Sequence, residues 1–228
     1  MPEIRDRGAR VQTLVLASGN AGKLREFSGL LGTKSFTLIT QTQLGIAACP
    51  EPHATFIENA LEKARHASRN SGHPALADDS GICVPMLGGA PGVLSARYAQ
   101  SEGFGSLKQS VGFDPLGQDG LSIDEQNNYA LQLAIRSQLV TSDPQETPAY
   151  YYCVLVLIRH EKDPQPIIAS GTWHGALISQ PRGDGGFGYD PYFFIANENQ
   201  TVAQMSAEKK NRLSHRAQAL RALMEQLR

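Results

Sequence analysis

The pattern of hydrophobic and polar positions divides the first third of the chain into short strands and amphipathic helices. An apolar run at Leu14–Ala17 predicts a strand, and apolar residues at helical spacing follow from Leu24 to Leu31. Phe36–Thr40 predicts a second strand, Thr55–Ser68 a helix with one apolar face, and Pro74–Ala77 a third strand. This alternation of strands and helices indicates an α/β organisation.

The rest of the chain is richer in strand patterns. Tyr150–Arg159 is a long run of β-branched and aromatic residues, Ile167–Ile178 is a second such run, and Pro191–Ile195 is a third. Helical patterns cover Ile123–Leu139 and the chain from about Ser206 onward. We therefore expect a mixed sheet with flanking helices.

The domain organisation follows from what interrupts these patterns. Glycines punctuate the stretch Gln100–Ser122, which has weak periodicity and predicts a long surface loop. We expect an N-terminal extension over residues 1–10 and a single domain over residues 11–228 that carries this loop.

Composition narrows the classes of function. The chain has 228 residues, of which 41% are hydrophobic, and a net charge of −1, so it lacks the basic field of proteins that bind nucleic acid polymers. A single nucleotide stays possible as a ligand. No span reaches transmembrane length, and Met1–Arg10 is not apolar, so we expect no membrane contact. Cys49, Cys83 and Cys153 are widely spaced, which favours reduced thiols in a cytoplasmic protein.

The first chemical feature is the loop behind the first strand. Ser18, Gly19, Asn20, Ala21, Gly22 and Lys23 lead directly into a predicted helix N-terminus. Small residues allow the backbone to approach a ligand, and the helix end, Lys23 and the polar side chains suit phosphate. The spacing is not that of a Walker A loop. An ordinary strand-to-helix connection with a capping Asn is the alternative.

Two adjacent carboxylates, Asp78 and Asp79, come directly after the third predicted strand and are followed by Ser80 and Gly81. Their mutual repulsion is relieved by a proton or a cation, and Mg²⁺ commonly joins one or two carboxylates to substrate phosphates. A polar turn with local hydrogen bonds is the alternative. Glu51 precedes a helix that Thr55 and Glu58 are expected to cap, and it is either a metal ligand or an ordinary solvated side chain.

The last two features contain aromatic and basic residues. In Gly185–Pro191, glycines flank Phe187 and Tyr189, which predicts either a surface where a base stacks or core packing. The final helix is expected to bury a stripe and to place Lys210 and Arg216 at its borders, with His215 nearly opposite; surface charges that only aid solubility are the alternative. The stripe consists of Leu213, Ala217, Leu220, Met224 and Leu227.

Five stretches resemble, in order and character, the Ham1-like family, also called the inosine triphosphate pyrophosphatase family. They are LVLASGNAGKLREF, TFIENALEKARHA, ALADDSGICVPMLGGAPGVLSARYA, GGFGYDPYFF and AEKKNRLSHRAQAL. The similarity runs from Val11 to Leu227 and is closest to the bacterial dITP/XTP pyrophosphatase branch. It implies an elongated mixed α/β sheet with flanking helices, two lobes around a nucleotide-binding cleft, and a homodimer. The implied reaction is Mg²⁺-dependent hydrolysis of dITP, ITP and XTP to the monophosphate and pyrophosphate, which cleanses the nucleotide pool.

The resemblance also implies roles for residues at matching positions. Asp79 would be the catalytic residue and a metal ligand, with Glu51 as the second metal candidate. Ser18 to Lys23 would bind the triphosphate and Ser80 would contact the substrate. The remaining substrate-binding positions are Phe187, Gly188, Tyr189, Asp190, Lys210, His215 and Arg216.

The sequence departs from the family at two places. Gln100–Ser122 is longer than the family's usual connection, and Cys49-Pro50 stands where another polar or acidic residue is common. Two other functions stay open: a Maf-like pyrophosphatase acting on other modified bases, and a nucleotide-binding regulator without catalysis. The Maf-like function is disfavoured by the helix residues Ser214 to Arg216 and the loop Phe187 to Pro191. A regulator without catalysis is disfavoured because Lys23, Asp78, Asp79 and Lys210 are all present.

Overall fold

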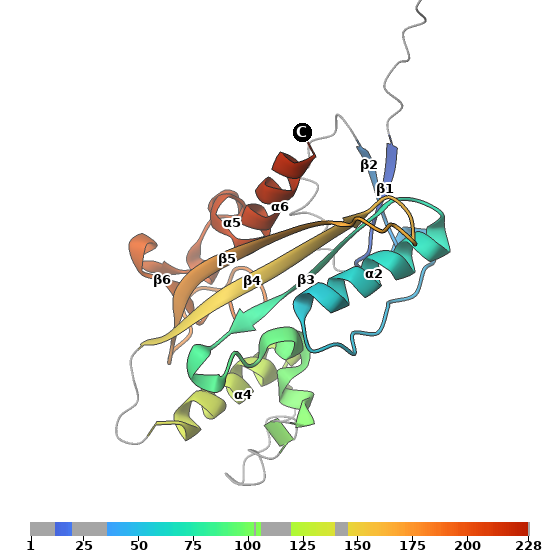
Figure 1. The fold of residues 1–228 in the computed structure, drawn as a ribbon. Helices are drawn as coiled ribbons and strands as arrows, with labels where there is room; N and C mark the ends of the chain where they lie inside the picture. The colour runs from blue at the N-terminus through green and yellow to red at the C-terminus, as the bar shows by residue number, and fades with distance from the viewer. Residues whose placement is uncertain (1–11, 20–35, 103, 106–119, 140–145, 228) are drawn as a thin grey trace, which may run out of the picture. The chain divides into compact units, whose positions relative to one another are not determined.

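The computed structural model describes the chain except residues 1–11, 20–35, 103, 106–119, 140–145 and 228 (Figure 1). The described strands are β1 (Gln12–Leu16), β2 (Phe36–Thr40), β3 (Ala75–Cys83), β4 (Glu146–Ile158), β5 (Ile167–Ile178), β6 (Phe193–Ile195) and β7 (Gln200–Thr201). The main described helices are α2 (Phe56–Ser71), α4 (Ile123–Ser137), α5 (Ala207–Leu213) and α6 (His215–Gln226). Short 3₁₀ segments connect several of them, including η2 (Pro85–Leu87) and η3 (Gly92–Gln100).

The described strands form one sheet in the order β2-β1-β3-β4-β5-β6-β7. β1 pairs in parallel with β2 and β3, whereas β6 pairs antiparallel with both β5 and β7. β4 and β5 are the two longest strands and lie next to each other (Figure 1). The expected mixed α/β sheet is confirmed, and β2 and β5 have the bounds that their hydrophobic runs predict.

The chain divides into two compact units. The first contains Met1–Asp78, Val154–Ala169 and Leu220–Arg228, and the second contains Asp79–Cys153 and Ser170–Ala219. In the first unit, α2 packs near β1. Of its predicted apolar face, Phe56 is half-buried and the three alanines are fully buried, because small side chains let a helix pack closely. Ala60, Ala64 and Ala67 have no exposed surface.

The ends of α2 follow the sequence signals. The Thr55 side chain accepts a hydrogen bond from the backbone N–H of Glu58, as expected of an N-cap. The Glu58 carboxylate accepts a hydrogen bond from the Thr55 hydroxyl at 2.6 Å. The helix ends at Gly72, whose φ of 71° is the left-handed conformation that favours glycine at this position.

The core of the second unit is aromatic. Phe193 lies edge-on to both Tyr151 and Trp173, with ring centroids 4.7 and 5.9 Å apart. Phe104 is fully buried, with its ring centroid 6.0 Å from that of Tyr98. This position belongs to Gln100–Ser122, so the prediction of a surface loop is wrong at Phe104; most of that stretch, residues 103 and 106–119, lies outside the described residues.

Several predicted boundaries are wrong by a few residues; β4, for example, begins at Glu146 and not at Tyr150. Two larger errors concern β3 and the final helix. β3 does not end at Ala77 but continues through both aspartates to Cys83, because this segment is buried. The final helix is two helices, since Ser214 has φ −61° and ψ 157°, an extended conformation that ends α5. Within the described ranges, the search for a helix with the length and apolar character of a membrane span found no candidate.

Candidate active site

The acidic pair lies inside a buried strand. Asp78 is 1% and Asp79 5% exposed, and Ser80 is half-buried. β3 passes very close to the next segment of chain at Gly81, where a Cβ atom would lie 2.3 Å from the Gly92 carbonyl oxygen. Glycine is therefore required here, and the strand carries Asp79 and Ser80 up to this tightly packed point. The polar turn considered from the sequence is excluded at Asp78 and Asp79.

The loop between β5 and β6 is folded around Asp190. The Asp190 Oδ2 atom accepts a hydrogen bond from the backbone N–H of Phe187 at 3.0 Å. Gly186 has φ 79°, and a Cβ atom there would lie 2.1 Å from the same Oδ2, so both the backbone and the carboxylate require glycine. Tyr189 is buried and its hydroxyl donates to the Ser95 carbonyl at 2.8 Å. The loop is thus closed on its own carboxylate and anchored in the core.

Asp190 is also the centre of a buried ion pair. Lys210 Nζ lies 2.7 Å from Asp190 Oδ2, and the two side chains are 11% and 5% exposed. The Tyr151 hydroxyl donates to Asp190 Oδ1 at 3.3 Å. Burial raises the pKa of Tyr151, and the negative charge of Asp190 adds to this effect, so the phenol stays protonated as a donor.

The break at Ser214 turns the next two residues toward this network. His215 is 3% exposed, and its ring stacks on Tyr151 with centroids 4.7 Å apart and planes 8° apart. The prediction that His215 lies opposite the buried stripe is therefore wrong, because the angular count assumed one continuous helix. Arg216 donates from its NH2 group to the Ser80 hydroxyl oxygen at 3.0 Å.

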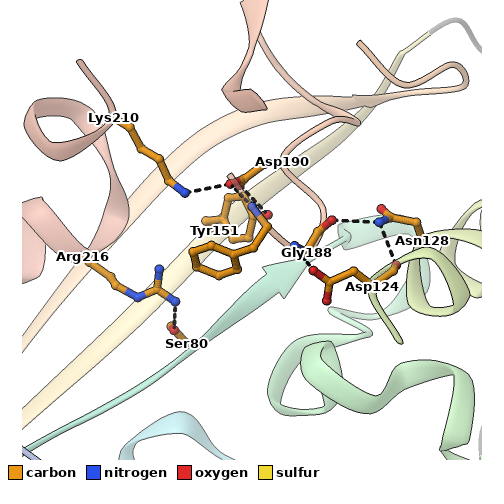
Figure 2. Close-up of polar contacts among 9 residues, drawn as sticks. Ser80, Asp124, Asn128, Tyr151, Gly188, Asp190, Lys210 and Arg216 are labelled. Atoms are coloured by element: carbon orange, nitrogen blue, oxygen red, sulfur yellow. Dashed lines mark hydrogen bonds and ion pairs between the residues drawn. The ribbon is translucent and has the colours of Figure 1, made fainter. Parts of the chain in front are cut away.

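Two cationic side chains, those of Lys210 and Arg216, lie over the ring of Phe187. The residue is 39% exposed, with Lys210 Nζ 4.5 Å and the Arg216 guanidinium carbon 5.4 Å from its ring centroid. Both distances are in the range of cation–π attraction. Figure 2 shows Arg216 directed at Ser80 and Lys210 directed at Asp190. The second unit thus brings together five predicted substrate-binding residues: Ser80, Phe187, Asp190, Lys210 and Arg216.

The first unit holds the other candidates. Ser18 follows β1, and its backbone N–H donates to the Leu16 carbonyl at 2.8 Å. Gly19 is exposed, and Asn20, Ala21, Gly22 and Lys23 lie outside the described residues. Glu51 Oε1 lies 2.9 Å from Nζ of Lys63, a buried residue of α2. An ammonium group therefore already balances part of the charge of Glu51.

The oxygen donors of Asp79 and Glu51 are hard ligands that suit Mg²⁺. Among the residues that the structure describes, no three His, Cys, Asp or Glu side chains cluster as a metal-binding set. A magnesium ion that bridges one or two carboxylates and a polyphosphate does not require such a set, so the residue types fit the ion.

Sequence reasoning missed three polar residues of the second unit. Tyr151 lies in the long aromatic run, where it resembles ordinary core, but strand alternation places it on the same face as the buried Cys153. Asp124 and Asn128 lie one helical turn apart on α4, and both contact the backbone of Gly188. Their spacing was the available signal, yet it is equally typical of a solvated helix face.

Comparison with known proteins places the chain in a family. A sequence profile described as Ham1 family matches residues 14–226. A protein of Ralstonia nicotianae named dITP/XTP pyrophosphatase is 50% identical over 218 residues, which cover 96% of this chain and 98% of the relative. A protein of Bordetella pertussis with the same name is 49% identical, with coverage of 96% and 92%.

Solved structures agree with the sequence comparison. A HAM1 protein from Coxiella burnetii superimposes with a TM-score of 0.79 at 36% identity, covering 95% of this chain and 98% of that one. A nucleoside-triphosphatase / dITP/XTP pyrophosphatase from Mycobacterium abscessus has a TM-score of 0.65 at 31% identity, with coverage of 93% and 98%. With its sequence, its fold and nearly its whole length matched, the chain belongs to the Ham1 family.

Proposed function

We propose that the protein hydrolyses deaminated purine nucleoside triphosphates, namely dITP, ITP and XTP, to the monophosphate and pyrophosphate. The observation that carries this proposal is the cluster in the second unit, where Arg216 contacts Ser80, next to Asp79 in the chain, and shares the exposed Phe187 ring with Lys210. Relatives at about half identity are named dITP/XTP pyrophosphatase, which supports dITP and XTP as substrates.

The reaction requires water to attack the α-phosphorus and pyrophosphate to leave. Charge builds on the phosphoryl oxygens and the leaving group, so positioned cations supply most of the catalysis. In our proposal Asp79 accepts the proton of the attacking water, and Lys23 with the Ser18–Lys23 backbone neutralises the leaving pyrophosphate. Mg²⁺ held by Asp79 and Glu51 would supply positive charge to the phosphates and orient them.

Base selectivity would come from hydrogen-bond donors. Hypoxanthine and xanthine present an oxygen at position 6, whereas adenine presents an amino group there. A guanidinium only donates, so Arg216 would pair with the oxygen and oppose the amino group. The exposed ring of Phe187 offers a face against which the purine packs, with Gly188, Tyr189 and Asp190 shaping the loop and His215 as a second donor.

The test is release of pyrophosphate by the purified protein in the presence of Mg²⁺. We expect dITP, ITP and XTP to be preferred over ATP by about 10⁴ or more in kcat/KM, the discrimination that a site built on a specific hydrogen bond reaches. Release of orthophosphate instead of pyrophosphate would contradict the reaction, and preference for another modified base would favour the Maf-like alternative. Tight ITP binding without turnover would favour a regulator.

The same proposal includes assembly and location. We infer a homodimer from the family resemblance. We infer a cytoplasmic location from the reduced thiols that the widely spaced cysteines indicate. Light scattering of the purified protein would test the dimer, with a mass of one 24.7 kDa chain as the contradicting result. Fractionation of the source cells would test the location.

A further inference from the structure

The first two turns of α4 contact both sides of one glycine in the candidate base-binding loop. Asp124 Oδ2 accepts a hydrogen bond from the backbone N–H of Gly188 at 2.6 Å. Asn128 Nδ2 donates to the Gly188 carbonyl oxygen at 2.8 Å and also to the Asp124 carbonyl oxygen at 2.9 Å. Figure 2 shows both side chains directed at the Gly188 backbone.

These two bonds hold different peptide planes. The N–H of Gly188 belongs to the peptide that joins it to Phe187, and its carbonyl belongs to the peptide that joins it to Tyr189. Holding both planes fixes φ and ψ of the residue between them. Gly188 has φ 60°, a left-handed conformation. Among the described residues other than its two chain neighbours, none has an atom within 4 Å of where its Cβ would be, so packing around a side chain does not hold this turn.

The flanking residues show what this turn controls. Tyr189 is anchored to the Ser95 carbonyl in the core, whereas Phe187 carries the exposed ring beside Lys210 and Arg216. The Asp190 carboxylate accepts the backbone N–H of Phe187, and the chain that links Phe187 to the Tyr189 anchor runs through Gly188. A change in the Gly188 dihedral angles would therefore change the position of the Phe187 ring relative to the two cations while Tyr189 stayed in place.

We propose that Asp124 and Asn128 are positioning residues that set base selectivity by fixing the Gly188 turn and hence the Phe187 ring. The two residues act through the backbone of the loop and not through the phosphates. This inference rests on the proposed function, because selectivity is measured as the ratio of kcat/KM for ITP to kcat/KM for ATP.

The test compares Asp124→Ala and Asn128→Ala with the matched control Asn127→Ala. Asn127 lies on the same helix and is 3% exposed. Its side-chain amide accepts a hydrogen bond from the Ala99 N–H at 2.9 Å and donates one to the Ala96 carbonyl at 3.0 Å, lengths similar to those of the Gly188 contacts. Its partners belong to η3, so its loss perturbs stability without releasing Gly188. Asp124→Asn keeps an acceptor oxygen for the Gly188 N–H and is the conservative variant.

We expect Asp124→Ala and Asn128→Ala to lower kcat/KM for ITP about tenfold or more, as loss of a hydrogen bond to a charged or buried group does. The kcat/KM for ATP should fall far less, so the ratio of kcat/KM for ITP to kcat/KM for ATP should decrease. In Asp124→Ala, hydrogen exchange at the Gly188 amide should accelerate. Asn127→Ala should leave both the ratio and the exchange unchanged, and Asp124→Asn should restore most of the ratio.

Two results overturn the proposal. One is equal loss on ITP and ATP in all three alanine variants, which would show a general structural role. The other is faster Gly188 exchange with an unchanged ratio, which would show that the turn does not set selectivity. Failure of the proposed function is recognised separately, because the unmodified protein would then release no pyrophosphate from ITP.

Discussion

Replacing Lys210 by Met removes the ammonium partner of a buried carboxylate while keeping a side chain of similar length. Asp190 is 5% exposed as a side chain and has Lys210 Nζ at 2.7 Å. At that separation, an effective dielectric constant of about 20 gives a gross attraction of roughly 6 kcal/mol. Most of this is offset by the cost of removing both charges from water, but loss of one partner leaves the other charge buried.

The net cost follows from what stays around Asp190. Removing one member of a buried pair typically costs about 3–5 kcal/mol. The Tyr151 hydroxyl and the Phe187 N–H still donate to the carboxylate, which places Lys210→Met at the lower end, at about 3 kcal/mol. For a chain of this size, that lowers the melting temperature by about 6–12 °C.

Urea denaturation of four proteins measures this effect. They are the unmodified protein, Lys210→Met, Asp190→Asn and the double variant, in which the two costs should fall short of additivity by about 2 kcal/mol. Lys209→Met is the control, because Lys209 pairs with Glu198 and both side chains are more than a quarter exposed, so its loss should cost less than about 1 kcal/mol. A cost below about 0.5 kcal/mol for Lys210→Met, or full additivity, would refute the reasoning.

Three further predictions concern catalysis and pH. Asp79→Asn should lower turnover at least about 100-fold, as excess chelator should in the unmodified protein, whereas an equal loss in Asp78→Asn would contradict a special role for Asp79. Arg216→Ala should lower kcat/KM for ITP about tenfold more than for ATP, and an equal loss on both would assign Arg216 to the phosphates. Hydrogen bonds from the Arg159 guanidinium and backbone hold the pKa of Asp163 well below its usual range, so its stabilisation is present above about pH 4 and is lost as the pH falls through the folded-state pKa. The difference in free energy of unfolding between the unmodified protein and Asp163→Asn should therefore shrink below about pH 4, and a constant difference down to pH 2 would contradict this.

The sequence predicted the strands best where both hydrophobicity and turn signals agree. Phe36–Thr40 and Ile167–Ile178 have the predicted bounds. The first is a short, mostly apolar run between polar residues, and Pro166 and Pro181 flank the second. The same reasoning predicted the end of β3 wrongly, because adjacent aspartates normally end a strand. Here Asp78 and Asp79 are buried within it, which is the kind of local conflict that functional sites carry.

The candidate site was predicted in its residue types but not in its partners. The motifs pointed to Ser80, Phe187, Asp190, Lys210 and Arg216, and the structure brings these side chains into contact. No one-dimensional pattern states that Lys210 pairs with Asp190, because that contact depends on a turn and a helix that meet only after folding. The roles of Asp79, Glu51 and the Ser18–Lys23 loop stay predictions.

The break between α5 and α6 explains why helical periodicity failed at His215. The Ser214 hydroxyl accepts a hydrogen bond from the Ala217 N–H at 3.2 Å, so Ser214 acts as an N-cap and starts a new helix. The first residue of α6 packs directly against Gly171 of β5, where a Cβ atom would lie 2.1 Å from the His215 carbonyl oxygen. A serine that caps and a glycine on a distant strand thus jointly seat α6 against the sheet. With α6 packed in this way, His215 stacks on Tyr151 and Arg216 reaches Ser80. One continuous helix from Ser206, counted at 100° per residue, would instead place His215 opposite the buried stripe.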